Sequence, residues 1–231
     1  MGVTRSKASS ELSKVLWLKL VGVLVAPLCL INLAVAFFGN ATVFPLSPFF
    51  LGPKLRALGT YALHRPKCLF VGHPEPGPVI EEAERRHRIP AGLLRILIDV
   101  ESSSRPHRIS SAGAMGLAQL QPGTAALLHV SDPFDTVQGI DGSARYLAEQ
   151  LARFRSIRLA VAAYNAGPGS VNGRVPVNGE TEFYVAKVVG QYERGLAEEA
   201  RAAAARHEEA RVAALKAGPR PARRARPRSV P

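Results

Sequence analysis

The chain has 231 residues, enough for one ordinary domain with extensions. Hydrophobic residues make up 47% and charged residues 21%, which suits a globular core and excludes a wholly disordered chain. The formal net charge is +12, and a basic balance indicates acidic partners such as nucleic acid, anionic lipid or another acidic polymer. Residues 201–231 carry nine basic and two acidic side chains, so most of the excess lies in a C-terminal tail.

The first segment, residues 1–39, has the features of a membrane-directing sequence. A basic flank precedes an apolar run over residues 20–38, whose length lies between a signal-peptide core and a spanning helix. The small-x-small pattern Ala34-Val35-Ala36 near its end is typical of a cleavage site. We therefore predict either a cleaved signal peptide or a membrane anchor with its basic end in the cytoplasm, rather than a buried core helix. Either outcome places the remainder in the periplasm or cell envelope, exported or anchored in the inner membrane.

Residues 40–78 form a Pro-rich stretch that also contains several glycines, which predicts a spacer with little regular structure. Cys68 lies in this stretch, and Cys29 lies in the apolar run. A disulfide between them stays open but is disfavoured, because one thiol would be buried in a membrane. The chain has no Cys-x-x-Cys pair and its six histidines are scattered, so we expect no metal site and no cofactor.

Residues 79–196 carry helical signals separated by short Gly/Pro loops. We expect helices over 79–87, from Pro90 to about 101, and from Pro122 onward, with a Gly-rich turn at 113–116 that leads into another short helix. Apolar residues at spacings of three and four predict an amphipathic helix over 137–154. Further helices are expected over 159–164 and from near Glu180. No convincing alternating strand is present in the sequence, so the predicted fold class is all-α.

The last segment, residues 197–231, is predicted to be an Ala/Arg-rich helix followed by a disordered basic tail. Residues 197–216 favour a helix by propensity but offer few large apolar side chains, and residues 218–231 are rich in Pro and Arg. Nucleic acid is not expected as a partner, because the predicted location is outside the cytoplasm. Attachment of the tail to an anionic polymer or lipid is the favoured interpretation, and it should weaken as salt rises.

Glu101 is the strongest candidate for chemistry on helical geometry alone. Leu94, Leu97 and Ile98 precede it by seven, four and three residues, so Glu101 lies on the apolar face of the expected helix. A carboxyl group that faces a core should have a raised pKa, and a protonated carboxyl can donate a proton to a glycosidic oxygen. The alternative is that Glu101 turns outward at the helix end.

Four sequence blocks around and after Glu101 occur in a recognisable order. They are Glu101-Ser102, the stretch from Ser110 through Gly113, Gly116 and Gln119 to Ala125, Ala163-Tyr164-Asn165, and Glu180-Thr181 with Tyr184-Val185. Together they resemble the catalytic domain of the soluble lytic transglycosylase family, which is related in fold to goose-type lysozyme. The resemblance covers about residues 79–192 and implies a lysozyme-like helical domain. Ala118 stands where the family usually has methionine, which predicts the loss of a side chain that lines the sugar groove.

The resemblance implies that the chain acts on peptidoglycan glycan strands. Glu101, as single acid and base, would protonate the oxygen between N-acetylmuramic acid and N-acetylglucosamine and then accept the proton of the muramic 6-hydroxyl, which closes an anhydro ring. The family has no second catalytic carboxylate, and the substrate's acetamido group would stabilise the oxocarbenium-like state. Holding the nucleophile in the same molecule supplies an effective concentration up to about 10⁵ M or more.

The resemblance also implies substrate-binding roles for six residues. Ser110 would orient Glu101, Gln119 would hydrogen-bond sugar groups, and Tyr164 would place its hydroxyl near the acetamido group or Glu101. The other three would shape or line the cleft: Asn165, Glu180 and Tyr184. Each also has a purely structural interpretation, such as a turn cap for Ser110, a helix C-cap for Asn165 or a helix N-terminal acid for Glu180.

Two other functions stay open from the sequence. A lysozyme-like muramidase would use water and would need a second carboxylate opposite Glu101, for which Asp132, Asp135 and Glu180 are the nearby candidates. A non-catalytic peptidoglycan-binding module would need no proton transfer by Glu101.

Overall fold

The fold is helical throughout the described residues. A computed structural model describes residues 3–39, 47–72 and 74–217, and within these ranges β structure is limited to isolated bridges joining Met115 to Ile109 and to Leu120. The predicted all-α class is therefore confirmed for the described chain. Contacts divide the chain into two compact units, Met1–Gly190 and Gln191–Pro231, which are described separately.

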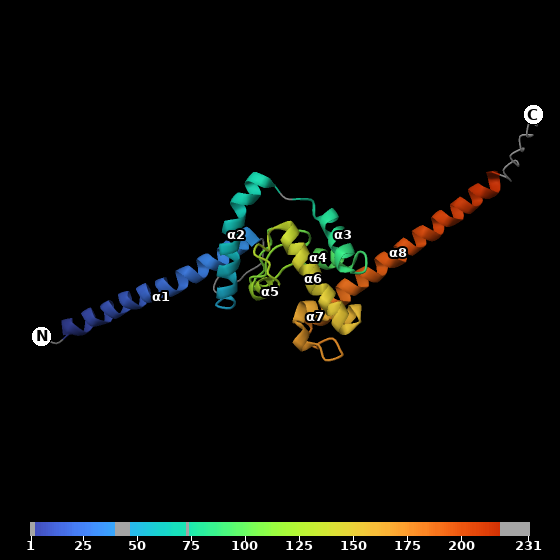
Figure 1. Ribbon diagram of the computed structural model, residues 1–231. Coiled ribbons are helices and arrows are strands. Elements are labelled where there is room, and N and C mark those ends of the chain that lie inside the picture. The colour runs from blue at the N-terminus through green and yellow to red at the C-terminus, as the bar shows by residue number, and fades with distance from the viewer. Residues whose placement is uncertain (1–2, 40–46, 73, 218–231) are drawn as a thin grey trace, which may run out of the picture. The chain divides into compact units, whose positions relative to one another are not determined.

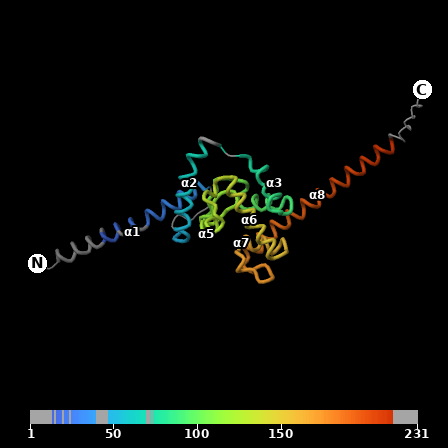
Figure 2. The backbone as a smooth tube through the Cα atoms, in the orientation of Figure 1, coloured from blue at the N-terminus to red at the C-terminus, as the bar shows by residue number. Residues whose placement is uncertain are grey.

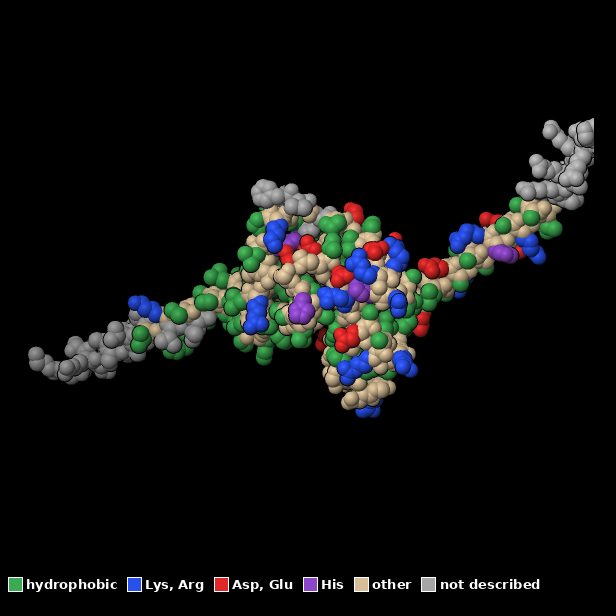
Figure 3. Space-filling view, viewed as in Figure 1, with side chains coloured by type: hydrophobic (Ala, Val, Ile, Leu, Met, Phe, Trp, Pro, Cys, Tyr) green, Lys and Arg blue, Asp and Glu red, His purple; other side chains and the backbone are tan. Residues whose placement is uncertain are grey.

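The first helix, α1 (Val3–Gly39), contains the apolar run, and its described side chains are largely hydrophobic (Figure 1, Figure 3). Within the described residues, Leu16–Gly39 is the stretch long and apolar enough to cross a membrane, with 24 residues and a mean hydropathy of 2.5. At 1.5 Å per residue the whole stretch would reach about 36 Å, but the part before the buried Asn32 reaches about 24 Å, less than the roughly 30 Å of a bilayer core. Length and composition alone do not separate an anchor from a signal sequence.

The Pro-rich spacer contains a helix, α2 (Leu51–Val71), so the expectation of little regular structure is wrong for these residues. Pro53 lies in the first turn, where a missing N–H costs nothing, and only Pro66 interrupts the helix interior. The inward face repeats at spacings of three and four through Lys54, Ala57 and Tyr61 and on to the buried His64. Two of these inward residues are polar, which hid the amphipathic pattern from sequence analysis.

The end of α1 packs into the core beside α2. Val35 is fully buried in a cluster that includes Ala57, Tyr61 and Phe134. The ammonium of Lys54 donates a buried hydrogen bond of 2.7 Å to the side-chain oxygen of Asn32. The last turns of α1 and the inward face of α2 therefore belong to one hydrophobic core.

Two helices position Glu101. The short helix α4 (Leu93–Ser102) follows α3 (Pro76–His87). Glu84, a buried residue of α3, accepts backbone N–H groups of Gly92, Leu94 and Arg95 at 2.9 to 3.2 Å. This carboxylate satisfies the open N-terminus of α4 and complements its helix dipole. The helix is thereby fixed at its start, with Glu101 in its last turn.

The next segment departs from the predicted short helix after the Gly-rich turn. Residues 113–120 form turns and bridges, because Gly113, Gly116 and Gln119 all have positive φ angles that a right-handed helix does not allow. A Cβ on Gly116 would clash with the backbone of Pro133. This non-helical backbone leads to α5 (Pro122–Leu127), which lies beside α2 in both backbone views (Figure 1, Figure 2).

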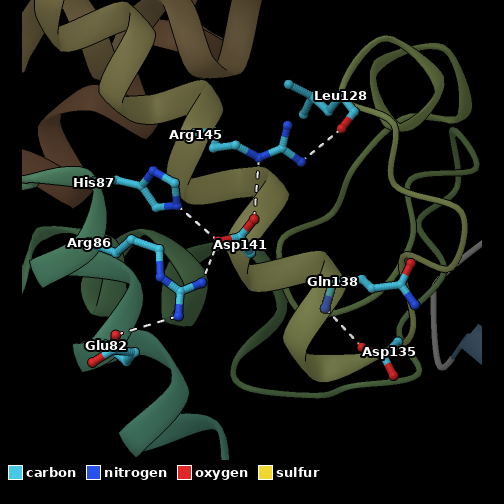
Figure 4. A network of polar contacts seen from close by, with 8 residues as sticks. All are labelled: Glu82, Arg86, His87, Leu128, Asp135, Gln138, Asp141 and Arg145. Atoms are coloured by element: carbon cyan, nitrogen blue, oxygen red, sulfur yellow. Dashed lines mark hydrogen bonds and ion pairs between the residues drawn. The ribbon is translucent and has the colours of Figure 1, made fainter.

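The central helix α6 (Thr136–Phe154) begins where Asp135 accepts the backbone N–H of Gln138 at 2.8 Å. It packs on α3 and on α7 (Ile157–Ala166), which is followed by a 3-10 turn, η1 (Pro168–Ser170). Asp141 of α6 contacts His87 at 2.9 Å and Arg86 at 3.3 Å on α3 (Figure 4). This ion-pair group ties the helix that caps α4 to the centre of the domain.

The last helix, α8 (Glu180–Ala217), begins where the sequence predicts and continues past residue 196 as one helix. Its first turns bury Tyr184, Val185 and Val188 in the first unit. Residues 201–216 are exposed, with charged side chains of both signs (Figure 3). The predicted disorder of residues 218–231 falls outside the described residues.

Candidate active site

A cavity of about 410 Å³ opens beside the last turn of α4. Its walls include most of the predicted site residues: Glu101, Ser110, Gln119, Tyr164, Asn165 and Glu180. The sequence separates these residues by up to 79 positions, and the packing of α4, α7 and α8 brings them together. Tyr184 contacts the cavity through Glu101.

The Glu101 carboxyl group lies inside this cavity and is mostly shielded from water. Burial raises its pKa from 4.5 to about 7, and the Tyr184 hydrogen bond and the positive charge of Arg108 oppose that rise in part. Burial dominates because an ionised carboxylate loses its hydration there. A carboxyl group whose pKa is raised this far populates both protonation states near neutral pH, so it can both donate and accept a proton.

Two tyrosines surround the acid. Tyr184 of α8 donates a hydrogen bond of 2.6 Å to Oε1 of Glu101. The hydroxyl of Tyr164 is 3.1 Å from both the backbone oxygen of Ala118 and the side-chain oxygen of Ser143. Burial first, and then the charge of Glu101, raises the pKa of both phenols, so both remain neutral donors. Of the two, Tyr184 makes the direct contact with Glu101, and the predicted place of the Tyr164 hydroxyl near the substrate's acetamido group stays a prediction.

Ser110 and Gln119 line the cavity. The hydrogen bonds that their side chains make go to backbone groups of the loop after α4. The Ser110 oxygen accepts the N–H groups of Ala112 and Ala114 at 3.2 and 3.0 Å. Among the described residues no hydrogen bond joins Ser110 to Glu101, and its orienting role stays a prediction. The Gln119 amide nitrogen donates to backbone oxygens of Gly116 and Arg108 at 2.8 and 3.2 Å. That arrangement leaves its side-chain oxygen as the atom able to meet a ligand N–H.

Asn165 and Glu180 lie where α7 ends and α8 begins. The Asn165 side-chain oxygen accepts the hydroxyl of Thr181 at 2.9 Å, and Thr181 is bound in turn by Asn178. This bridge sets the position of the first turn of α8, and thereby of Tyr184, against α7. Glu180 is exposed at the cavity wall.

Sequence analysis missed Arg108. Its side chain lines the same cavity, and its positive charge lowers the pKa of Glu101. Burial and the neighbouring Arg105 lower the pKa of Arg108 itself. Arg108 follows Glu101 by seven residues, but α4 ends at Ser102, so a helical repeat does not connect the two side chains.

The Ala118 side chain is buried and is not part of the cavity wall, and the effect of lacking a methionine here stays a prediction. It is 1% exposed and belongs to the same core cluster as Val35 and Phe134. Its backbone oxygen is the acceptor for Tyr164.

Comparison with known proteins identifies the family to which this segment is similar. Residues 78–187 match the family model described as the transglycosylase SLT domain, a span that contains Glu101 and every cavity residue named above. This segment belongs to the SLT family. The chain is 34% identical over 110 residues to a transglycosylase of Enterobacteria phage PRD1, covering 48% of this chain and 40% of the phage protein.

Two further proteins are similar to part of this chain. A membrane-bound lytic murein transglycosylase F of Desulfosudis oleivorans is 36% identical over 105 residues, which is 42% of this chain and 23% of that protein. The crystal structure of an inactive mutant of the lytic transglycosylase Slt from Pseudomonas aeruginosa aligns with a TM-score of 0.43 and 22% identity, over 59% of this chain and 28% of that one. The chain therefore spans less than half the length of these proteins.

Proposed function

We propose that this protein is a peptidoglycan lytic transglycosylase that cuts the bond between N-acetylmuramic acid and N-acetylglucosamine, with Glu101 as its single acid and base. The observation that carries the proposal is a shielded carboxyl group with a pKa near 7 in the wall of an open cavity, inside an SLT domain. An acid with a pKa near the working pH is suited both to donate and to accept a proton.

The proposed reaction uses Glu101 twice. The protonated carboxyl gives its proton to the glycosidic oxygen, the bond to the anomeric carbon breaks, and N-acetylglucosamine leaves with a hydroxyl. The 6-hydroxyl of the muramic sugar then attacks the anomeric carbon, and its proton returns to Glu101. The products are an anhydro-muramic end and a shortened strand, and no water is consumed.

The cavity residues support each stage differently. Tyr184 donates to Glu101 and stabilises the ionised form that exists after the first proton transfer. Arg108 adds a positive charge that favours the same state. Gln119 offers its side-chain oxygen to an acetamido N–H, and Glu180 and Asn165 border the space where sugars would lie.

A muramidase that uses water is the competing activity. Of the three carboxylates considered for it, Asp132 is bound to His64 and Asp135 caps α6, which leaves Glu180 at the cavity wall. Mass analysis of fragments released from purified peptidoglycan separates the two reactions. Anhydro ends support the proposal, whereas reducing ends that disappear in Glu180→Gln would establish a hydrolase. Release of no fragments, with glycan binding equal in wild type and Glu101→Gln, would indicate a binding module.

We also propose that α1 stays attached as a membrane anchor and that the active site faces the periplasm. Cleavage after Ala36 would remove Val35 from the core and Asn32 from its bond with Lys54. The basic tail would then add electrostatic attachment to anionic lipid or wall polymer, which should weaken as salt rises. Membrane fractionation of the full chain, with intact mass of the recovered protein, tests retention directly.

A further inference from the structure

Three potential metal ligands meet on the side of the domain that α2 covers. His64 and Cys68 are four residues apart on α2, and therefore share a helix face, while His107 comes from the loop after α4. One ligand atom from each of the three residues lies within 4.8 Å of the others. Cys68 Sγ is 3.7 Å from Nε2 of His107, and the two histidine rings lie 5.4 Å apart between centroids.

These distances are close to those of a tetrahedral site. Metal–nitrogen and metal–sulfur bonds of about 2.0 and 2.3 Å at a tetrahedral angle place ligand atoms roughly 3.3 to 3.6 Å apart. The Cys68–His107 pair already has this separation, and closing the widest pair requires a shift of roughly 1 Å, within reach of side-chain rotation. No disulfide competes for the thiol, because Cys29 and Cys68 are both reduced in the described structure.

A carboxylate supports the histidine at the centre of this group. Nδ1 of His64 lies 2.9 Å from Oδ2 of Asp132, and both side chains are buried. Metal-bound histidines commonly donate one ring N–H to a carboxylate, which fixes the tautomer and directs the other nitrogen to the ion. Asp132 also accepts the backbone N–H of Phe134 at 3.2 Å, so this carboxylate is itself held in place.

We propose that His64, Cys68 and His107 bind a zinc ion, with Asp132 as the carboxylate that orients His64. Two imidazoles and one thiolate are a ligand set of intermediate softness, which suits Zn²⁺ and excludes the hard ions Mg²⁺ and Ca²⁺. Three protein ligands leave a fourth position for water. The site contradicts the expectation of no metal drawn from the sequence, where the helical spacing of His64 and Cys68 was the available signal.

The proposed ion would connect α2 to the loop that leads into the active site. It joins α2, whose inward face packs on the end of α1, to the loop residue immediately before Arg108. Arg108 lines the Glu101 cavity, so a bound ion would restrain the loop that carries this charge. The role is structural, and it rests on the geometry at α2 rather than on the proposed transglycosylase activity.

The test is metal binding by the full chain in detergent micelles, after reduction and removal of metal by a chelator. We expect one Zn²⁺ per chain by calorimetry, and a Co²⁺ complex with the visible bands of a tetrahedral thiolate site. Cys68→Ser should abolish the thiolate band, and Asp132→Asn should weaken Zn²⁺ affinity about 10- to 100-fold. Cys29→Ser is the matched control and should bind as wild type does.

Circular dichroism of every variant checks that a loss of binding is not a loss of fold, and His107→Gln repeats the test where Cys68→Ser is poorly folded. Absence of stoichiometric Zn²⁺ binding by wild type would overturn the proposal. So would binding by Cys68→Ser equal to wild type, or loss of binding in Cys29→Ser. Tight binding of copper(I) alone would overturn the assignment of the ion.

Discussion

Replacing Glu101 by glutamine should make the protein more stable at alkaline pH, because the buried carboxylate carries a cost that a neutral amide lacks. A pKa raised from 4.5 to about 7 corresponds to about 3.4 kcal/mol between the protonated and ionised folded states. The side chain is partly exposed, and solvent screening lowers the expected value to about 2–3 kcal/mol.

The pH dependence of this effect has a definite sign. Below pH about 4.5 the carboxyl is protonated in both the folded and the unfolded chain, so it has no effect on the free energy of unfolding. Between about 4.5 and 7 the unfolded chain ionises first, and stability falls as pH rises. Above pH 7 the full cost is present. Glu101→Gln should therefore match wild type at pH 4 and exceed it by about 2–3 kcal/mol at pH 8.

Thermal unfolding of the full chain in detergent, followed by circular dichroism at both pH values, measures this difference. For a protein of this size the gain corresponds to a rise in Tm of roughly 5–10 °C. Asp99→Asn is the matched control, since Asp99 is an exposed carboxyl on the same helix and should change stability by less than about 0.5 kcal/mol. Equal pH dependence in wild type and Glu101→Gln would refute the claim that the carboxyl is shielded.

Three further predictions concern the cavity and the core. Tyr184→Phe removes a hydrogen bond that lowers the pKa of Glu101, so the alkaline limb of the activity–pH profile should move to higher pH; an unchanged limb would contradict this. Arg108→Met should move the same limb in the same direction and Arg108→Lys much less, because only the first removes the charge. Val35→Ala should cost about 2 kcal/mol in thermal unfolding although it lies in the apolar run, while the exposed Leu33→Ala should cost far less. Equal costs for these two variants would place Val35 outside the core.

The helices after residue 79 could be predicted because their apolar spacing and their caps agree. Glu101 itself follows from the same logic, since the residues at three, four and seven positions before it are apolar and all of them are buried. These spacings are local signals, because all of the residues involved lie on one face of a single helix. What these signals do not predict is the partners of Glu101, which are Tyr184 on α8 and Arg108 in the loop after α4.

The features that could not be predicted from the sequence depend on contacts between distant segments or on unusual backbone conformation. α2 was hidden because Lys54 and His64 occupy inward positions, where each is satisfied by a partner far along the chain. The segment after Gly113 looked helical in composition, but close backbone packing requires positive φ there. Ala118 is buried in the cluster that also contains Val35, and no local signal in the sequence indicates that burial.

The burial of Val35 beside α2 has a mechanical consequence for the proposed anchored enzyme. A catalytic head on a loose tether would sweep through a range of heights and could reach strands throughout the wall. A catalytic domain whose core includes the final turns of its own anchor has no such freedom. Its active site would stay at one height above the lipid. Such an enzyme would open only the innermost layer of the sacculus, and lengthening the join by a flexible insert should broaden the layers that it digests.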